Sequence, residues 1–191
     1  MHNAKTHALE PLERARKTLG KTSEAIRRAL GRLRGHRFRV SFRLYHGWHK
    51  GWQEADNLRA LITAAAERGS TGWRNVAFAG QVEYGHTLLS ALPSRLTAKS
   101  IHLPGTLRQQ ARNLRPVEKM VDTALASDLL YWAFAGDEGW AIVMSNDIDV
   151  IPPVLTAEAS TSGTRRRVLI LKTAQWRSLL VDVRGLLLEA Q

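Results

Sequence analysis

The chain has 191 residues, of which 44% are hydrophobic and 24% are charged, so one globular domain is expected and two full-sized domains are excluded. It contains no cysteine, which excludes a disulfide scaffold, a thiolate zinc site and a cysteine nucleophile. The sequence shows neither a secretory signal nor a run of about 20 apolar residues, and this predicts a cytoplasmic protein with no membrane partner.

Positive charge is concentrated near the amino terminus. Residues 1–43 hold 12 basic and 3 acidic side chains, a local net charge of +9, whereas the whole chain carries +11. This pattern is typical of contact with a phosphate backbone, although two solvated surface helices would also produce it. We therefore divide the chain into a basic amphipathic helical segment, residues 1–35, and a domain over residues 36–191. The candidate RNA-binding residues in the basic region are Arg27, Arg28, Arg32, Arg37, Arg39 and Arg43.

The first elements follow from capping residues and periodicity. One helix is predicted from Pro11 to a stop at Gly20, and a second from an N-cap at Ser23 to Gly35. Each has one apolar face, so both should dock on another surface. Residues 37–45 alternate between apolar and mostly arginine side chains, which predicts a strand near a sheet edge or facing a solvated surface. A helix over 58–65 and a strand over 76–79 complete this half.

The second half alternates helices and strands. From 81 to 115 the pattern is weak, and only a helical turn near Leu88 and a broken strand over 101–107 are predicted. An apolar face from Val117 to Trp132 then predicts a helix. The remaining predicted elements are a buried strand over 140–144, a helix after Pro152, a flexible loop over 156–164, a strand over 167–171 and a helix over 176–187. This order predicts an α/β fold with a mainly parallel sheet, and the last helix is either core or a homodimer face.

Two carboxylates follow the buried strand directly. Asp147 and Asp149 stand just beyond its carboxyl end, where open α/β sheets build their sites, and Ser145 and Asn146 form the turn that leads to them. Neighbouring carboxylates repel each other, and a divalent cation is the usual compensation. The alternative is that Asp147 only caps the next helix while Asp149 is solvated.

A second acidic pair lies on the preceding helix. Asp122 falls in its first turn, and Asp128 lies on its apolar face, where a carboxylate needs a partner. Because this helix and the buried strand are consecutive, all four acids could approach one crevice. There Mg²⁺ or Mn²⁺ would activate water for attack on a phosphodiester. Lys119, three residues before Asp122, either contacts a phosphate or is an ordinary surface residue.

The two acidic motifs together resemble a known family. The run E-K-M-V-D-T-A-L-A-S-D-L-L at 118–130, followed by V-M-S-N-D-I-D-V-I-P at 143–152, is similar to the NYN domain of the PIN-like nuclease superfamily. The resemblance implies a PIN-like three-layer sandwich with a mainly parallel central sheet, and a divalent-metal-dependent endoribonuclease acting on RNA. The residues that match the family's motifs are Asp122, Asp147 and Asp149 as metal-binding and catalytic acids, Asp128 as the second acid of the helix motif and a catalytic residue that orients ligands or water, and Ser145 and Asn146 as the strand-end turn.

One departure from the family leaves alternatives open. The family's first strand ends in an aspartate, and no such strand precedes Phe38 here. Either a longer form of the protein carries that strand upstream of Met1, or this is a variant with weak or no activity, or the alignment is wrong. The alternative functions are a catalytically inactive RNA-binding or assembly module and a structural protein that docks on an acidic partner. The loop residues His46, Trp48, His49 and Trp52 either stack on single-stranded RNA or pack on the sheet.

Overall fold

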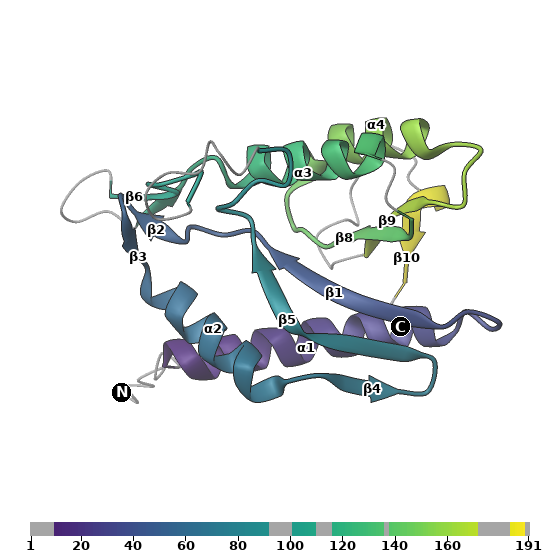
Figure 1. Cartoon of the computed structure of the whole chain (residues 1–191), viewed down its shortest axis with the longest axis horizontal. Helices are drawn as coiled ribbons and strands as arrows, with labels where there is room; N and C mark the ends of the chain where they lie inside the picture. The colour runs from purple at the N-terminus through teal and green to yellow at the C-terminus, as the bar shows by residue number, and fades with distance from the viewer. Residues whose placement is uncertain (1–9, 92–100, 110–115, 136–137, 172–183, 190–191) are drawn as a thin grey trace, which may run out of the picture.

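Helices cover the strands of this protein from both sides. The computed structural model describes residues 10–91, 101–109, 116–135, 138–171 and 184–189. Helices α1 and α2 lie on one side of the strands and α3 and α4 on the other (Figure 1). Their bounds are α1 Pro11–Gly31, α2 Asp56–Arg68, α3 Val121–Ala135 and α4 Ile151–Thr161. The α/β class expected from the sequence is therefore present.

The larger strands form two three-stranded sheets, in the orders β1-β5-β4 and β10-β9-β8. The pairs β1–β5, β8–β9 and β9–β10 are parallel, and β4–β5 is antiparallel. The strand bounds are β1 Phe38–Leu44, β4 Thr71–Trp73, β5 Val76–Tyr84, β8 Trp140–Val143, β9 Arg167–Leu171 and β10 Leu187–Leu188. Two short antiparallel pairs are β2 His49–Lys50 with β3 Gln53–Glu54, and β6 Leu107–Arg108 with β7 Val117–Glu118. The strand predicted near a sheet edge is the edge strand β1.

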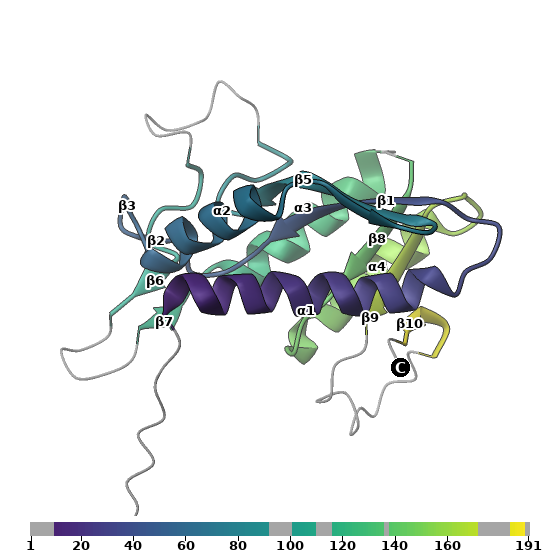
Figure 2. The same cartoon turned by 90° about the horizontal axis from the view of Figure 1, so that it is seen from below.

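The basic segment forms one helix, and the prediction of two helices was wrong. Gly20 does not end the first helix, and Ser23 lies inside α1 rather than at an N-cap. A continuous stripe of buried residues, which includes Leu19 and Ile26, runs along the whole helix. Packing of this stripe outweighs the roughly 1 kcal/mol that a glycine costs in a helix interior. Figure 2 shows α1 running unbroken beneath the strands.

Gly20 gives a simple test of that continuous helix. It is exposed, and a Cβ placed on it would have no atom within 4 Å. Gly20→Ala should therefore raise the free energy of unfolding by about 0.5–1 kcal/mol, measured by urea denaturation. Gly35→Ala is the contrasting variant, because Gly35 has a φ of +81° and alanine there should be destabilising. A destabilised Gly20→Ala protein would mean that the helix breaks at residue 20.

Three apolar clusters hold the layers together. One joins α1 to α2, a second joins α1 to both sheets, and a third joins α3 and α4 to β8 and β9. The two sheets meet through side chains at the first residues of β1 and β8, where the rings of Phe38 and Trp140 lie 5.2 Å apart. The basic helix thus docks on the body of its own chain. Within the described ranges, no helix is long and apolar enough to cross a membrane.

Several element boundaries differ from the predictions. Helix α3 begins at Val121 rather than Val117, because residues 117 and 118 pair with β6 as strand β7. Leu88 lies in a non-helical turn, and of the broken strand over 101–107 only Leu107 is in a strand. The predicted helix over 176–187 lies mostly outside the described residues, and Leu187 belongs to β10.

The stretch predicted as a flexible loop over 156–164 is helical as far as Thr161. The hydroxyls of Thr156 and Ser160 donate to the backbone carbonyls of Pro152 and Thr156, at 3.0 and 2.8 Å. Hydroxyl groups that bond the carbonyl four residues earlier fit inside a helix, whereas the composition of this stretch favours turns. The helix also buries Ala157 completely, so packing decides its length.

Candidate functional site

The predicted acids beyond β8 sit in a tight, exposed turn. The hydroxyl of Ser145 accepts from the backbone N–H of Asp147 at 3.0 Å, and Oδ1 of Asp147 accepts from the N–H of Asp149 at 2.9 Å. Asp147 thereby caps the short 3₁₀ turn Ile148–Val150 that leads into α4. The capping interpretation is therefore correct for one oxygen of Asp147. Its other oxygen and the carboxylate of the exposed Asp149 lie at the carboxyl end of a parallel strand.

The carboxylate of Asp122 is close enough to Asp147 and Asp149 for their negative charges to raise its pKa. It lies in the first turn of α3, as predicted. Its pKa is raised, first by partial burial and then by the negative charge of Asp147, with smaller contributions from Glu118 and Asp149. Three carboxylates, from β7 and from the turn after β8, thus act on Asp122 at the start of α3. Mutual repulsion of this kind favours a bound proton or cation.

The donor chemistry of this group suits a hard divalent cation. Mg²⁺ and Mn²⁺ take oxygen ligands, and Mg²⁺ usually keeps several waters and needs only one or two protein carboxylates. Asp122, Asp147 and Asp149 supply such oxygens at the surface. Among the described residues, however, no group of three or more carboxylate or histidine side chains is arranged to hold a metal ion. The acids are gathered within electrostatic reach, but their side chains do not form a ready-made ligand cage.

Glu118 and His46 lie beside the group formed by Asp122, Asp147 and Asp149. The sequence did not indicate that Glu118 belongs to the site. His46 Nδ1 forms an ion pair with Glu118, and the backbone N–H of Gly47 donates to the same carboxylate at 3.2 Å. His46 lies two residues beyond β1, so this pair joins the carboxyl end of β1 to the start of α3. The exposed Lys119 lies in the adjoining turn, where its N–H donates to the Thr106 carbonyl at 2.9 Å.

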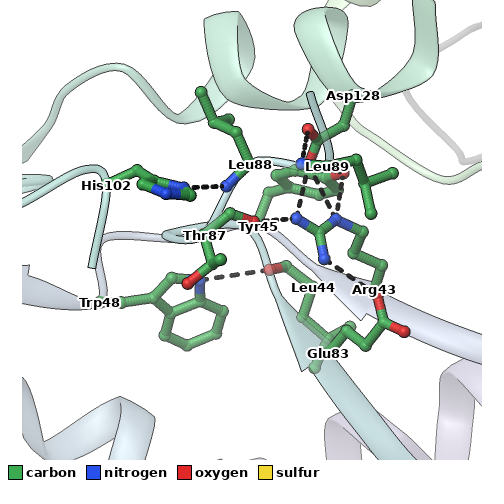
Figure 3. Close-up of polar contacts among 10 residues, drawn as sticks. All are labelled: Arg43, Leu44, Tyr45, Trp48, Glu83, Thr87, Leu88, Leu89, His102 and Asp128. Carbon is green, nitrogen blue, oxygen red and sulfur yellow. Dashed lines mark hydrogen bonds and ion pairs between the residues drawn. The ribbon is translucent and has the colours of Figure 1, made fainter. Parts of the chain in front are cut away.

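Asp128 has a different environment from the other three aspartates (Figure 3). Its side chain is 1% exposed, and Arg43 contacts Oδ2 through Nε at 2.8 Å and Nη2 at 2.7 Å. The Tyr45 hydroxyl donates to Oδ2 at 2.9 Å, and the Leu89 N–H donates to Oδ1 at 2.7 Å. The prediction that Asp128 orients ligands or water in the crevice does not fit this geometry. Asp128 instead ties α3 to the end of β1.

Arg43 is likewise part of the fold rather than of an RNA-facing surface. Only 18% of its side chain is exposed, and it contacts Glu83 at 2.9 Å and the Thr87 carbonyl besides Asp128. The alternation along β1 placed Arg43 correctly on the polar face of the strand. The alternation could not show that α3 covers the carboxyl end of that face. The prediction that Arg43 binds RNA is therefore corrected, because its guanidinium group is used within the fold. Arg39, earlier on the same face, is exposed.

Aromatic and histidine side chains pack beneath the acids. Trp48 is 1% exposed and donates from Nε1 to the Leu44 carbonyl at 3.2 Å, and its ring contacts those of His46 and Tyr84. Trp48 and the buried His49 therefore pack into the fold instead of offering stacking surfaces, whereas Trp52 is exposed. His86, which lines a small pocket beside this group, has its pKa lowered to about 4 by burial and by the nearby His49, Arg43 and His102.

The remaining predicted RNA-binding arginines lie away from the acids. Arg27 and Arg28 both pair with Glu24 on α1. Arg37 and Arg39 are exposed at the beginning of β1, the opposite end of that strand from Arg43 and His46. Arg32 is exposed close to the end of α1. The structure therefore does not bring the basic residues and the acids into one surface.

Comparison of the chain with family models, with curated proteins and with solved structures gave no match.

Proposed function

We propose that this protein is a divalent-metal-dependent endoribonuclease with an NYN-type, PIN-like domain that lies in the cytoplasm. The observation that carries the proposal is the convergence of Asp122, from the start of α3, with Asp147 and Asp149, from the carboxyl end of β8. Ligand and catalytic sites of open α/β sheets form at this end of the strands. The site is also accessible, because all three side chains are exposed.

The arrangement of the two sheets supports a PIN-like fold whose first strand is not among the described residues. In the described part of the chain, β1 pairs only with β5 and β8 pairs only with β9, so β1 and β8 are both parallel strands at an edge of their sheets. These two strands contact each other at their first residues through Phe38 and Trp140. One parallel strand between β1 and β8 would join the halves into a single sheet with its carboxyl end at the acids.

In the proposed reaction the aspartates divide into three metal ligands and one structural residue. Asp122, Asp147 and Asp149 would hold Mg²⁺ or Mn²⁺, which when bound lowers the pKa of water and neutralises charge that develops on a phosphate. Ser145 positions the backbone of Asp147, and the N–H of Asp149 fixes the orientation of the Asp147 carboxylate. Lys119, exposed and three residues before Asp122, would contact a phosphate. Asp128 acts only through the fold, by holding α3 against β1.

Cleavage of a labelled RNA of mixed structure tests the proposal. The protein is incubated with Mn²⁺, with Mg²⁺ or with a chelator, in parallel with Asp147→Asn. Metal-dependent cleavage should fall by more than about 100-fold in this variant, since loss of an outer-shell partner alone commonly costs 10- to 100-fold. Circular dichroism and a binding assay in chelator should show an intact fold and unchanged RNA affinity.

Asp56→Asn is the matched control. Asp56 is also an exposed aspartate near the start of a helix, but among the described residues its ion pair is with Arg59 on the same helix. Cleavage by this variant should equal that of the unmodified protein. Equal cleavage by Asp147→Asn, or cleavage that persists in chelator, would contradict the proposed metal site.

A non-catalytic RNA-binding or assembly module is the second candidate. It is favoured by the lack of a ready-made cage of three ligands among the described residues and by the full engagement of Asp128 within the fold. This candidate predicts salt-sensitive RNA binding and no metal-dependent turnover. The cleavage assay separates the two functions directly.

A further inference from the structure

Exposed arginines gather at the amino ends of the parallel strands, opposite the acids. They precede or begin β1, β5 and β9, and one follows α1. The set comprises Arg34, Arg37, Arg39, Arg74, Arg165 and Arg167, and we call it the amino-end patch. None of these six side chains forms an ion pair with any other residue that the structure describes. The patch therefore carries uncompensated positive charge.

The first part of this surface is built around Trp73, whose side chain is 43% exposed. The guanidinium carbon of Arg74 lies 4.1 Å from the Trp73 ring centroid, and that of Arg27 lies 4.3 Å from it. Stacking on an aromatic ring restricts a guanidinium group, so less freedom is lost when it binds an anion. Trp73 thus holds two cations in place at the turn between β4 and β5.

Arg74 occupies a backbone position that normally favours glycine or asparagine. It is the first residue of the two-residue turn between β4 and β5, and its φ is +54°. A positive φ costs a non-glycine residue about 1 kcal/mol or more. Arg74 forms no ion pair with a described residue, so no ion pair offsets the cost of this backbone conformation. Backbone strain that no ion pair offsets is typical of functional positions, so we infer that the Arg74 side chain has a function.

A hydrogen bond and a ring contact connect the turn between β4 and β5 with the second sheet. Asn75, next to Arg74, donates to the His36 carbonyl at 3.1 Å, and the His36 ring lies 5.6 Å from that of Trp140. The guanidinium carbon of Arg167 lies 5.1 Å from the Trp140 centroid. Arginines from both sheets therefore belong to one surface. Among the described residues, the nearby acids are Glu24, which pairs with Arg27 and Arg28, and the exposed Glu138.

We propose that the amino-end patch binds the backbone of single-stranded RNA at a site separate from the acids. Planar guanidinium groups match phosphates in a bidentate way and also stack on bases, and Trp73 and His36 add exposed ring edges. A lipid surface is less suited, because Trp73 is the only large exposed apolar side chain among the described residues of the patch. An acidic protein would satisfy the charge but would make no use of the ring surfaces.

The location of the patch defines how a long RNA would lie on the protein. This path of the RNA rests on the proposed nuclease function. β1 has seven residues and spans roughly 23 Å at 3.3 Å per residue, with Arg37 before its first residue and His46 beyond its last. An RNA held at the patch must run along the body of the protein to reach Asp122. Cleavage should therefore favour RNAs long enough to contact both ends.

Binding measured in chelator tests the patch independently of cleavage. The probe is a labelled single-stranded RNA of mixed sequence, titrated by fluorescence anisotropy over a range of salt concentrations. The triple variant Arg74→Gln, Arg165→Gln, Arg167→Gln should reduce the slope of log K against log salt by about 2, at about 0.7 for each phosphate contact. At 0.1 M salt this corresponds to affinity about 100-fold weaker.

The matched control removes three exposed cations from the first part of α1, as Arg14→Gln, Lys17→Gln, Lys21→Gln. It changes the net charge equally and should leave the slope and the affinity nearly unchanged. Equal losses in the two triple variants would overturn the patch, because binding would then follow net charge alone. A patch variant that loses affinity for polyglutamate or anionic vesicles but keeps its affinity for RNA would also overturn it. Asp147→Asn should bind normally, so a failure of the nuclease proposal remains distinguishable.

Discussion

Replacing Asp128 with alanine should lower the free energy of unfolding by about 3–5 kcal/mol. The variant would leave the Arg43 guanidinium, only 18% exposed, without the carboxylate that it contacts through two nitrogens. Removing one partner of a buried ion pair is strongly destabilising, because the other charge stays buried. The Tyr45 hydroxyl and the Leu89 N–H would lose their acceptor as well. Urea denaturation followed by tryptophan fluorescence measures the change.

Two further variants identify the cause. Glu83→Gln removes the other carboxylate that contacts Arg43. The Glu83 side chain is 54% exposed, so this variant should lower the free energy of unfolding by less than about 1 kcal/mol. The double variant Arg43→Met, Asp128→Leu removes both buried charges and should be more stable than Asp128→Ala, since an apolar pair can replace a buried ion pair. A loss of less than 1 kcal/mol in Asp128→Ala would show that the network contributes little to stability.

Stability should also fall as the pH is lowered from 6.5 to 4, partly because of His86. Burial holds the pKa of His86 at about 4 in the folded protein, against 6.5 for an ordinary histidine. Above pH 6.5 neither state binds the proton, so this stability is fully present. Between 6.5 and 4 the unfolded chain binds the proton and the folded protein does not, and up to about 3 kcal/mol is lost.

The contribution of His86 is isolated by substitution. His86→Gln keeps a polar side chain that does not titrate, so the curve of unfolding free energy against pH should become flatter in this interval. His36→Gln, at an exposed histidine, controls for the change from histidine to glutamine as such. The same slope in the protein with and without His86 would mean that this histidine titrates alike in both states.

The sequence was most informative where periodicity was continuous. The alternation at 37–45 and the apolar run at 140–144 correspond to β1 and β8, since side chains on a strand report directly which face is buried. The break predicted at Gly20 failed because a single residue preference is weaker than burial of the stripe along α1. The loop predicted before Arg165 failed for a similar reason, since contacts of Ala157 maintain helix α4.

The candidate site was only partly predictable. Asp122, Asp147 and Asp149 could be grouped because each follows a recognisable element boundary, and the structure places them within electrostatic reach of one another. The different role of Asp128 depends on Arg43 and Leu89, which are 85 and 39 residues away along the chain. Glu118 was overlooked as a member of the acidic group because its neighbour His46 comes from the other half of the chain. Contacts of this range leave no local pattern.

The separation of the amino-end patch from the acids also gives the molecule an electric dipole moment along its parallel strands. Positive charge lies where the strands begin, and the acidic group lies where β8 ends. In the field of a polyanion such a molecule experiences a torque before any contact is made, and its positive end turns toward the polyanion. Encounter complexes would therefore form with the acids facing away, and a reorientation or a flexible RNA segment is required before the acidic end is reached.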